Sequence, residues 1–173
     1  MITYQISGSG VIYKDSQSGE IKYIPNDSAN SDWLTYQKWL AEGNTPDPEY
    51  TLDQRKDMRK GDLMSVMMRY MEGDISYNDK IYSSSGEERN CINTLIASGD
   101  RGELTFPLKW NDTSMDPQDL VLDDLKKIQK GEALLIEACA DNYGALYTVI
   151  DASTDPESVD INADWPTVPY VVA

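Results

Sequence analysis

The sequence predicts an α+β protein: a β-hairpin and an aromatic helix, then a small mixed body with a long C-terminal helix and an extended proline-rich arm. Two kinds of pattern lead to this fold class. Short runs that alternate apolar and polar residues between turn residues are typical of strands. Apolar residues spaced three or four apart are typical of helices. With 173 residues, 40% of them hydrophobic, the chain can bury a core.

Changes in these patterns divide the chain into four expected parts. They are the hairpin and aromatic docking helix (1–44), a proline-rich hinge (45–50), the mixed α/β body (51–152) and the C-terminal arm (153–173). The first part opens with an alternating run over residues 2–6. Residues 11–13 and 21–24 then flank a polar, glycine-containing loop, which predicts a hairpin.

A helix is expected from about residue 30 to residue 42. Asn30 or Ser31 can accept hydrogen bonds from its free N–H groups, and Gly43 suits the left-handed residue that often ends a helix. One face of this helix is bulky, with Trp33, Tyr36 and Leu40 in line and Trp39 on the flank. We predict that this face binds a partner. The alternative is that it covers Tyr13, Ile21 and Tyr23 of the hairpin.

A second helix is expected from Thr51, because Thr51 and Gln54 match the capping-box pattern. It reaches about Glu72 unless Gly61, which costs about 1 kcal/mol relative to alanine, breaks it. Methionines line one face, at positions 64, 67 and 71. Such a stripe either fills a core or forms an adaptable binding surface.

Residues 75–82 predict a tight hairpin, with Asn78-Asp79 as its turn and Ile75 opposite Tyr82. The serines at 83–85 are expected to cap a third helix that extends to about Ala97. Its expected apolar face consists of Cys91, Ile92, Leu95 and Ile96.

Residues 104–110 alternate and predict a strand with one buried face, which Pro107 confines to a sheet edge. Asp116-Pro117 suits the N-cap and first turn of the last helix, which runs to about Asp151. That helix is long for a globular domain, so a glycine is expected to divide it, either Gly131 or Gly144.

The residues from 153 onward change in character, because repeated prolines favour an extended chain. Trp165 and Tyr170 are the large apolar residues of this arm. We predict that they contact a partner. The alternative is that the arm folds over its own sheet edge near residues 104–110.

The chain is strongly acidic, with 15 Lys and Arg against 30 Asp and Glu and a net charge of −15. This charge repels nucleic acid and anionic membranes, so neither is an expected partner. Cys91 and Cys139 lie among apolar residues and are expected to be two buried thiols, although a disulfide between them remains open. The sequence shows neither a signal peptide nor a membrane-length apolar run, which favours a cytosolic protein.

No catalytic, cofactor or metal site is predicted. The chain has no histidine, which removes the commonest general base and the commonest metal ligand. It also lacks paired CxxC motifs and the usual nucleotide-binding motifs. The carboxylates are numerous, but no pair stands out for acid–base chemistry. The densest acidic cluster consists of Asp112, Asp116, Asp119, Asp123 and Asp124, and it lacks calcium-loop spacing.

One segment, residues 24–46, resembles tail-fibre and tail-fibre-assembly proteins of tailed bacteriophages. Ile24-Pro25 leads through Asp and Asn to a spaced aromatic trio, then to Gly43-Asn44 and a proline-rich exit. Residues 52–152 are similar, more weakly, to the poorly characterised domain that often follows in such proteins.

The resemblance implies a non-enzymatic protein that binds the end of a phage tail fibre, either as a structural tip or adaptor subunit or as an assembly chaperone. It implies a location in the virion tail, with assembly in the host bacterial cytoplasm. The expected partner is the fibre protein, and the expected contacts are Trp33, Tyr36, Trp39, Leu40, Trp165 and Tyr170. The alternative function is an acidic mimic of DNA that inhibits a host DNA-binding defence enzyme.

Overall fold

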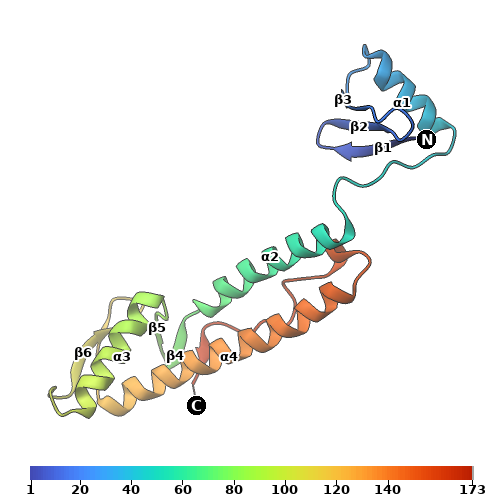
Figure 1. Ribbon diagram of the computed structural model, residues 1–173. Coiled ribbons are helices and arrows are strands. Elements are labelled where there is room, and N and C mark those ends of the chain that lie inside the picture. Colours follow the sequence, from blue (N-terminus) through green and yellow to red (C-terminus); the bar gives the residue numbers. More distant parts are fainter. Residues whose placement is uncertain (173) are drawn as a thin grey trace. The chain divides into compact units, whose positions relative to one another are not determined.

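The computed structural model describes residues 1–172, which form two compact units (Figure 1). The first unit is Met1–Arg55 and the second begins at Lys56. Both units combine helices with strands, so the predicted α+β class is confirmed.

The N-terminal unit is a three-stranded antiparallel sheet with one helix packed on it. Its elements are β1 (Ile2–Ser7), β2 (Gly10–Asp15), β3 (Ile21–Pro25) and α1 (Ser31–Ala41), and the strand order is β1-β2-β3. The predicted hairpin is therefore confirmed as β2 and β3. Asn30 caps α1 as expected, because its side chain accepts hydrogen bonds from the N–H groups of Asp32 and Trp33.

The aromatic face of α1 builds the core of this unit. Tyr36 is buried with Tyr4, Val11 and Ile24 of the sheet. The ring of Tyr4 lies 4.9 Å from that of Tyr36 and 4.9 Å from that of Trp39. Tilted aromatic pairs at this spacing are favourable beyond the area they bury, so the bulky residues of this helix hold the unit together.

The segment after α1 covers the outer edge of β1. Ile6 donates its N–H to the carbonyl of Asp47, and Asp47 donates its own N–H to the carbonyl of Tyr4. The amide of Gln5 donates to the carbonyls of Pro48 and Glu49. Because an open strand edge invites unwanted pairing, the segment predicted as a hinge protects one edge of this sheet.

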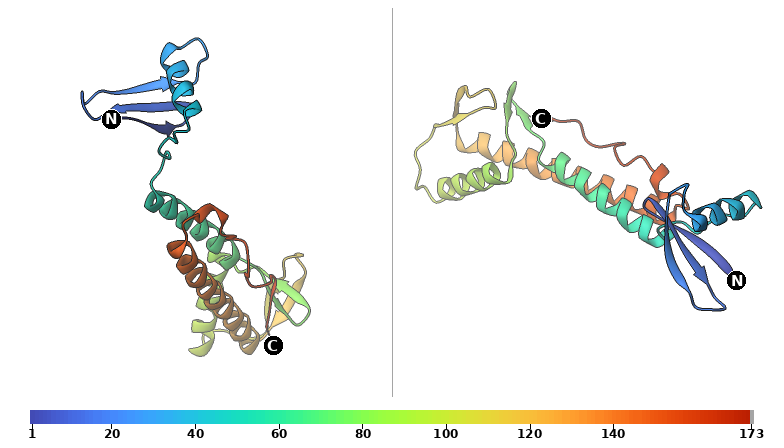
Figure 2. Two further views of the ribbon diagram at one scale, coloured as in Figure 1. Left: turned by 90° about the vertical axis from the view of Figure 1, so that its right-hand side faces the viewer. Right: turned by 90° about the horizontal axis from the view of Figure 1, so that it is seen from above.

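The second unit is built around two long helices (Figures 1 and 2). Its elements in chain order are α2 (Leu52–Met71), β4 (Ile75–Tyr77), β5 (Lys80–Tyr82), α3 (Gly86–Asp100), β6 (Leu108–Asn111), β7 (Pro117–Leu120), α4 (Leu122–Ala152), a 3₁₀ turn (Pro156–Ser158) and β8 (Tyr170–Val171). The strands form two small sheets, β5-β4-β8 and β6-β7. The predicted hairpin register is confirmed, since Ile75 pairs with Tyr82 and Asn78 and Asp79 adopt the positive φ of its turn.

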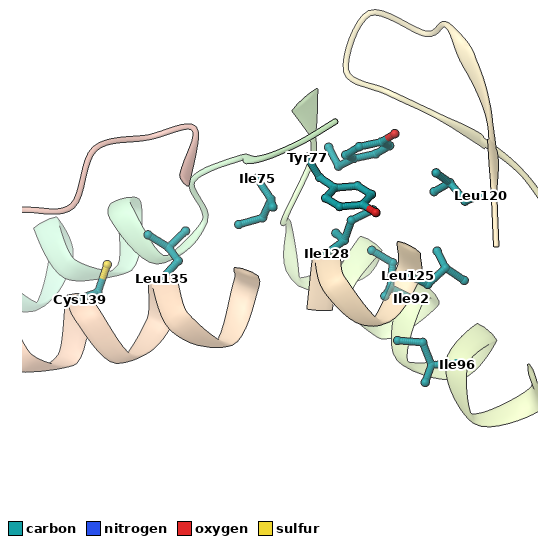
Figure 3. Close-up of a cluster of buried hydrophobic side chains, with 10 residues drawn as sticks. Ile75, Tyr77, Ile92, Ile96, Leu120, Leu125, Ile128, Leu135 and Cys139 are labelled. Carbon is teal, nitrogen blue, oxygen red and sulfur yellow. The ribbon is translucent and has the colours of Figure 1, made fainter. Parts of the chain in front are cut away.

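The main core lies where α3, α4 and both small sheets meet (Figure 3). Ile75 and Tyr77 of β4 contact buried residues of the two helices. The fully buried members on the helices are Ile92, Leu125, Ile128, Leu135 and Cys139. Four of these five residues lie at helical spacing on one side of α4, which therefore faces the core.

The C-terminal arm packs against both long helices, α2 and α4. Leu63 of α2, Ile150 of α4 and Ile161 of the arm form one buried cluster. Further along, β8 pairs in parallel with β4, with Tyr170 beside Ile75. The arm therefore packs on its own unit, but on β4 and the two helices and not on residues 104–110 as the alternative expected.

Three local predictions are wrong, in addition to the expected division of α4 by a glycine. Asp116-Pro117 does not begin a helix: Pro117 starts β7, and α4 begins at Leu122 with Val121 as its cap. The strand over residues 104–110 is shorter, with β6 starting only at Leu108. Cys91 is exposed on α3, whereas Cys139 is buried, and both are free thiols.

Both long helices are continuous. Gly61 does not break α2, and neither Gly131 nor Gly144 divides α4. The structure gives Gly131 a specific reason: a Cβ there would collide with the side chain of Val172 and lie 3.1 Å from Ile75. This glycine lets the arm approach α4 closely.

Candidate functional site

The structure packs the aromatic residues of α1 against their own sheet. Tyr36 is buried, and Trp33, Trp39 and Leu40 are partly buried against the same cluster. These four residues of α1 cover Tyr13 of the sheet, but they do not cover Ile21 or Tyr23. A role of these residues in partner binding stays a prediction, and the apolar surface that the unit leaves open lies elsewhere.

The arm residues Trp165 and Tyr170 are also packed within their own unit. The ring of Trp165 stacks on that of Tyr70 at 5.2 Å, and its indole N–H donates to the carbonyl of Ile161 at 2.8 Å. Tyr170 donates its backbone N–H to the carbonyl of Asp74 at 2.7 Å. These contacts make both residues part of the seam that fastens the arm. Their predicted contact with a partner is likewise a prediction that stays untested.

Two exposed apolar residues of the N-terminal unit, Ile21 and Tyr23, lie on the face of the sheet opposite α1, which we call the open face. Cross-strand neighbours point to the same side of a sheet, so the register assigns residues to this face. Ile21 aligns with Lys14 and Thr3, and Tyr23 aligns with Ile12 and Gln5. Ile21 is 70% exposed and Tyr23 is 52% exposed.

A glycine leaves room for the tyrosine of the open face, and a serine bonds to its hydroxyl. A Cβ on Gly10 would collide with the backbone carbonyl of Ile24 and lie 2.7 Å from the hydroxyl oxygen of Tyr23, so glycine gives room both for the close approach of β3 and for this ring across β2. The Tyr23 hydroxyl shares a hydrogen bond of 3.1 Å with Ser9. An aromatic ring that is fixed in this way loses little entropy on contact with a partner, which favours binding.

A shallow hollow adjoins Ile21 on the same face. Its volume is about 360 Å³, and its lining includes Thr3, Lys14 and Ile21 together with the β2–β3 loop. Lys14 donates to the side chain of Gln5 at 2.7 Å, which places its ammonium group beside the hydrophobic residues. The open face thus combines an apolar centre with a polar border, as protein interfaces do.

Charged residues of both signs lie around the open face. Asp15, at the rim of the hollow, accepts hydrogen bonds from the Gln17 N–H and the Ser18 hydroxyl, which lower the pKa of its carboxyl group. On the opposite side of the sheet, a hydrogen bond to Asp32 raises the pKa of Lys22. These charged groups already have partners, so the unpartnered part of the face is apolar.

The edge of the sheet adds a second means of contact. β3 is an edge strand of the order β1-β2-β3, and its residues include both Ile21 and Tyr23. Edge strands present backbone N–H and C=O groups that can pair with a strand of another protein. The apolar side chains and the pairing edge therefore lie on the same strand.

The alternative to partner binding placed Ile21 and Tyr23 under the aromatic helix. The strand register separates these two residues from the helix. The residues of β3 that align with Tyr4 and Val11 lie on the helix side of the sheet, whereas Ile21 and Tyr23 alternate with those residues and lie on the other side. The alternation of β1 indicated a sheet with two different faces. Only the pairing of β2 with β3 shows which residues of β3 lie on each face.

A cavity of the second unit, of about 760 Å³, is lined by residues of β6, the following turn and α3. Its carboxylates already serve the fold. Asp112 accepts the N–H groups of Ser114 and Asp116, and Glu88 accepts the hydroxyl of Ser85 at 3.0 Å. Across residues 1–172, acidic residues and cysteines form no group of three or more that could hold a metal ion.

Glu132 is a second group of interest, in a groove between α3 and α4. Only 3% of it is exposed, and its Oε1 atom has no hydrogen-bond partner. Burial raises the pKa of its carboxyl group to about 7, against the lowering effect of Arg89 and with a further increase from Glu88. A lone buried carboxyl affects stability, as discussed below, but is no catalytic pair.

Comparison of the chain with protein-family models, curated proteins and solved structures finds no match. Among the helices of residues 1–172, none has the length and apolar character that crossing a membrane requires.

Proposed function

We propose that this chain is a non-enzymatic, phage tail-fibre-associated protein that binds the end of a fibre through the open face of its N-terminal sheet. The observation that carries the binding role is the pair Ile21 and Tyr23, which are exposed on the same face of the edge strand β3. The phage context rests on the resemblance of residues 24–46 to tail-fibre and tail-fibre-assembly proteins.

Two forms of this function are compatible with the proposal. A structural tip or adaptor subunit stays in the virion tail, whereas an assembly chaperone acts in the host cytoplasm and leaves. An arm that becomes ordered on a partner would have favoured retention, but this arm is packed on its own unit. Mass spectrometry of purified virions separates the two roles, because only a subunit remains in the particle.

The binding role is tested by affinity capture from phage-infected cells with the full chain as bait. We expect the wild type to retain a long fibre protein at both low and high salt, because apolar contacts are little screened. The double variant Ile21→Lys, Tyr23→Ser should lose it. The matched control is Leu34→Lys, since Leu34 is 50% exposed on α1 of the same unit.

Two outcomes would contradict the proposal. Equal capture by the wild type and the double variant would remove the open face as the binding surface. Capture of a DNA-binding enzyme instead of a fibre protein, with steep loss at high salt, would favour the DNA-mimic function.

A further inference from the structure

The outward face of α2 is an unpartnered methionine surface in the second unit, separate from the open face. The inward side of this helix is fully used, since Leu63 is buried in the arm seam and Met67, Tyr70 and Met71 pack against the main core. The other side carries Met58, Met64 and Met68, which are 54%, 42% and 50% exposed. We call these three residues the methionine stripe.

The spacing of the stripe suits a second helix. Met64 and Met68 are four residues apart and lie on one side of α2, whereas Met58, six residues before Met64, lies about 120° round the helix from it, so the three residues flank Gly61 and cover about 15 Å of the helix length. Gly61 lies between Met58 and Met64, and nothing is within 4 Å of the position a Cβ would take there. The fold of the unit thus leaves open space beside this glycine, which allows close approach of a partner.

The charges of α2 are divided between its two sides. The basic side chains are turned toward the arm and α4: Lys60 pairs with Asp151 at 2.7 Å, and Arg59 donates to the carbonyl of Val159. Lys56 also donates to the carbonyl of Asp151.

The exposed acidic residues include Asp57 and Asp62 on α2 and Glu72 just beyond its end, and Asp62 also pairs with Arg59 at 3.8 Å. Arg69 is the one basic residue of α2 that is itself exposed, and its guanidinium lies over the ring of Tyr70 at 5.4 Å. The methionine stripe is therefore bordered mainly by negative charge.

We propose that the methionine stripe binds a basic amphipathic helix of a partner protein. Methionine side chains are flexible and polarizable, so they adapt to the apolar face of such a helix. The acidic border pairs with lysines or arginines on its flanks and rejects acidic helices. The recognition mode is a helix laid along an apolar stripe.

The test uses the full-length protein and a fluorescein-labelled peptide of about 18 residues, long enough to span the stripe as a helix. The peptide contains leucine and lysine only, with the leucines at helical spacing on one face. A scrambled peptide has the same composition with its leucines spread around the helix, and a third peptide has glutamate in place of lysine. Binding is measured by fluorescence anisotropy.

We expect the amphipathic basic peptide to bind at least about tenfold more tightly than the scrambled one, which corresponds to about 1.4 kcal/mol. The variant Met64→Gln, Met68→Gln keeps the charge of the protein and should lose most of this difference. Met115→Gln is the matched control, because Met115 is 73% exposed but lies in the turn after β6. Circular dichroism verifies that each variant retains its helices.

Three results would overturn the proposal. The first is equal affinity of the wild type and the double variant for the basic peptide. The second is equal binding of the acidic peptide. The third is a wild type that sediments as a dimer and a double variant that sediments as a monomer, since a second copy would then occupy the stripe.

Discussion

Glu132 is the residue at which burial most clearly opposes ionisation of the side chain. It lies in the groove between α3 and α4, and its Oε1 atom has no hydrogen-bond partner. The nearby Arg89 uses its guanidinium on the carbonyl of Met71 and the hydroxyl of Ser84. Arg89 therefore connects α2 to α3 and offsets only part of the penalty for burying a negative charge.

This conflict predicts a pH dependence of stability. The carboxyl ionises near pH 4.5 when the chain is unfolded and near pH 7 when it is folded. Between these values the folded chain binds a proton that the unfolded chain has lost, so this group makes the free energy of unfolding fall as pH rises. Glu132→Gln removes the fall: it should match the wild type at pH 4 and be about 1–3 kcal/mol more stable at pH 8.

Urea denaturation across this pH range measures the difference. Glu137→Gln is the control, because Glu137 is exposed on the same helix. If the two variants differ from the wild type by the same amount at every pH, Glu132 is not the titrating group.

Two glycines of α4 give a matched pair of predictions. Alanine at 144 meets nothing within 4 Å, so Gly144→Ala should stabilise the protein by about 0.5–1 kcal/mol through helix propensity. Alanine at 131 collides with Val172, so Gly131→Ala should destabilise it by about 1–2 kcal/mol despite the same gain in propensity. Thermal unfolding of both variants checks the pair. A stabilising Gly131→Ala would mean that the arm does not dock there.

At the scale of elements, the sequence predicted those whose signals are local. The capping box of Thr51 and Gln54 forms with bonds of 2.9 and 3.2 Å, and Ser85 caps α3 as expected. The start of α4 was misplaced because Asp116-Pro117 also suits a strand entry. Pairing of β7 with β6 decides between the two, and no local pattern shows that pairing.

The same limit applies to the candidate site. The aromatic face of α1 was evident from its spacing, but what it covers depends on the strand register. That register places Tyr13 under the helix and Ile21 on the open face. The exposure of the methionines on α2 was likewise undetermined, because it depends on where the arm packs.

The contacts of α1 predict a local defect for the double variant Trp33→Ala, Trp39→Ala. Both side chains pack on the core of the N-terminal unit, and removing large buried side chains costs about 3–5 kcal/mol each when burial is complete. We expect the N-terminal unit to unfold without any partner present, while the second unit keeps its structure.

Amide hydrogen exchange of the full chain reports on each unit separately. Loss of protection confined to residues 1–50 is the expected result. Full protection there would mean that the two tryptophans are free for partner contact, as the sequence first indicated.

At the scale of the whole molecule, the chain consists of two units with separate cores. The sequence predicted a boundary at residues 45–50, and the structure divides the chain at Arg55 and Lys56. The difference arises because residues 47–49 bond to β1, which composition alone does not show. The excess of acidic residues lies mainly in the second unit, whose most basic helix turns its positive side inward.

The packing of the arm has a consequence for the order of synthesis. Residues from Val159 to Val172 fill the seam between α2 and α4 and complete the sheet beside β4, so the second unit cannot reach its final core until they have left the ribosome. The N-terminal unit needs no residue beyond the first 55. During synthesis the first unit can therefore fold completely before the last strand of the second unit, β8, is available to pack on its helices.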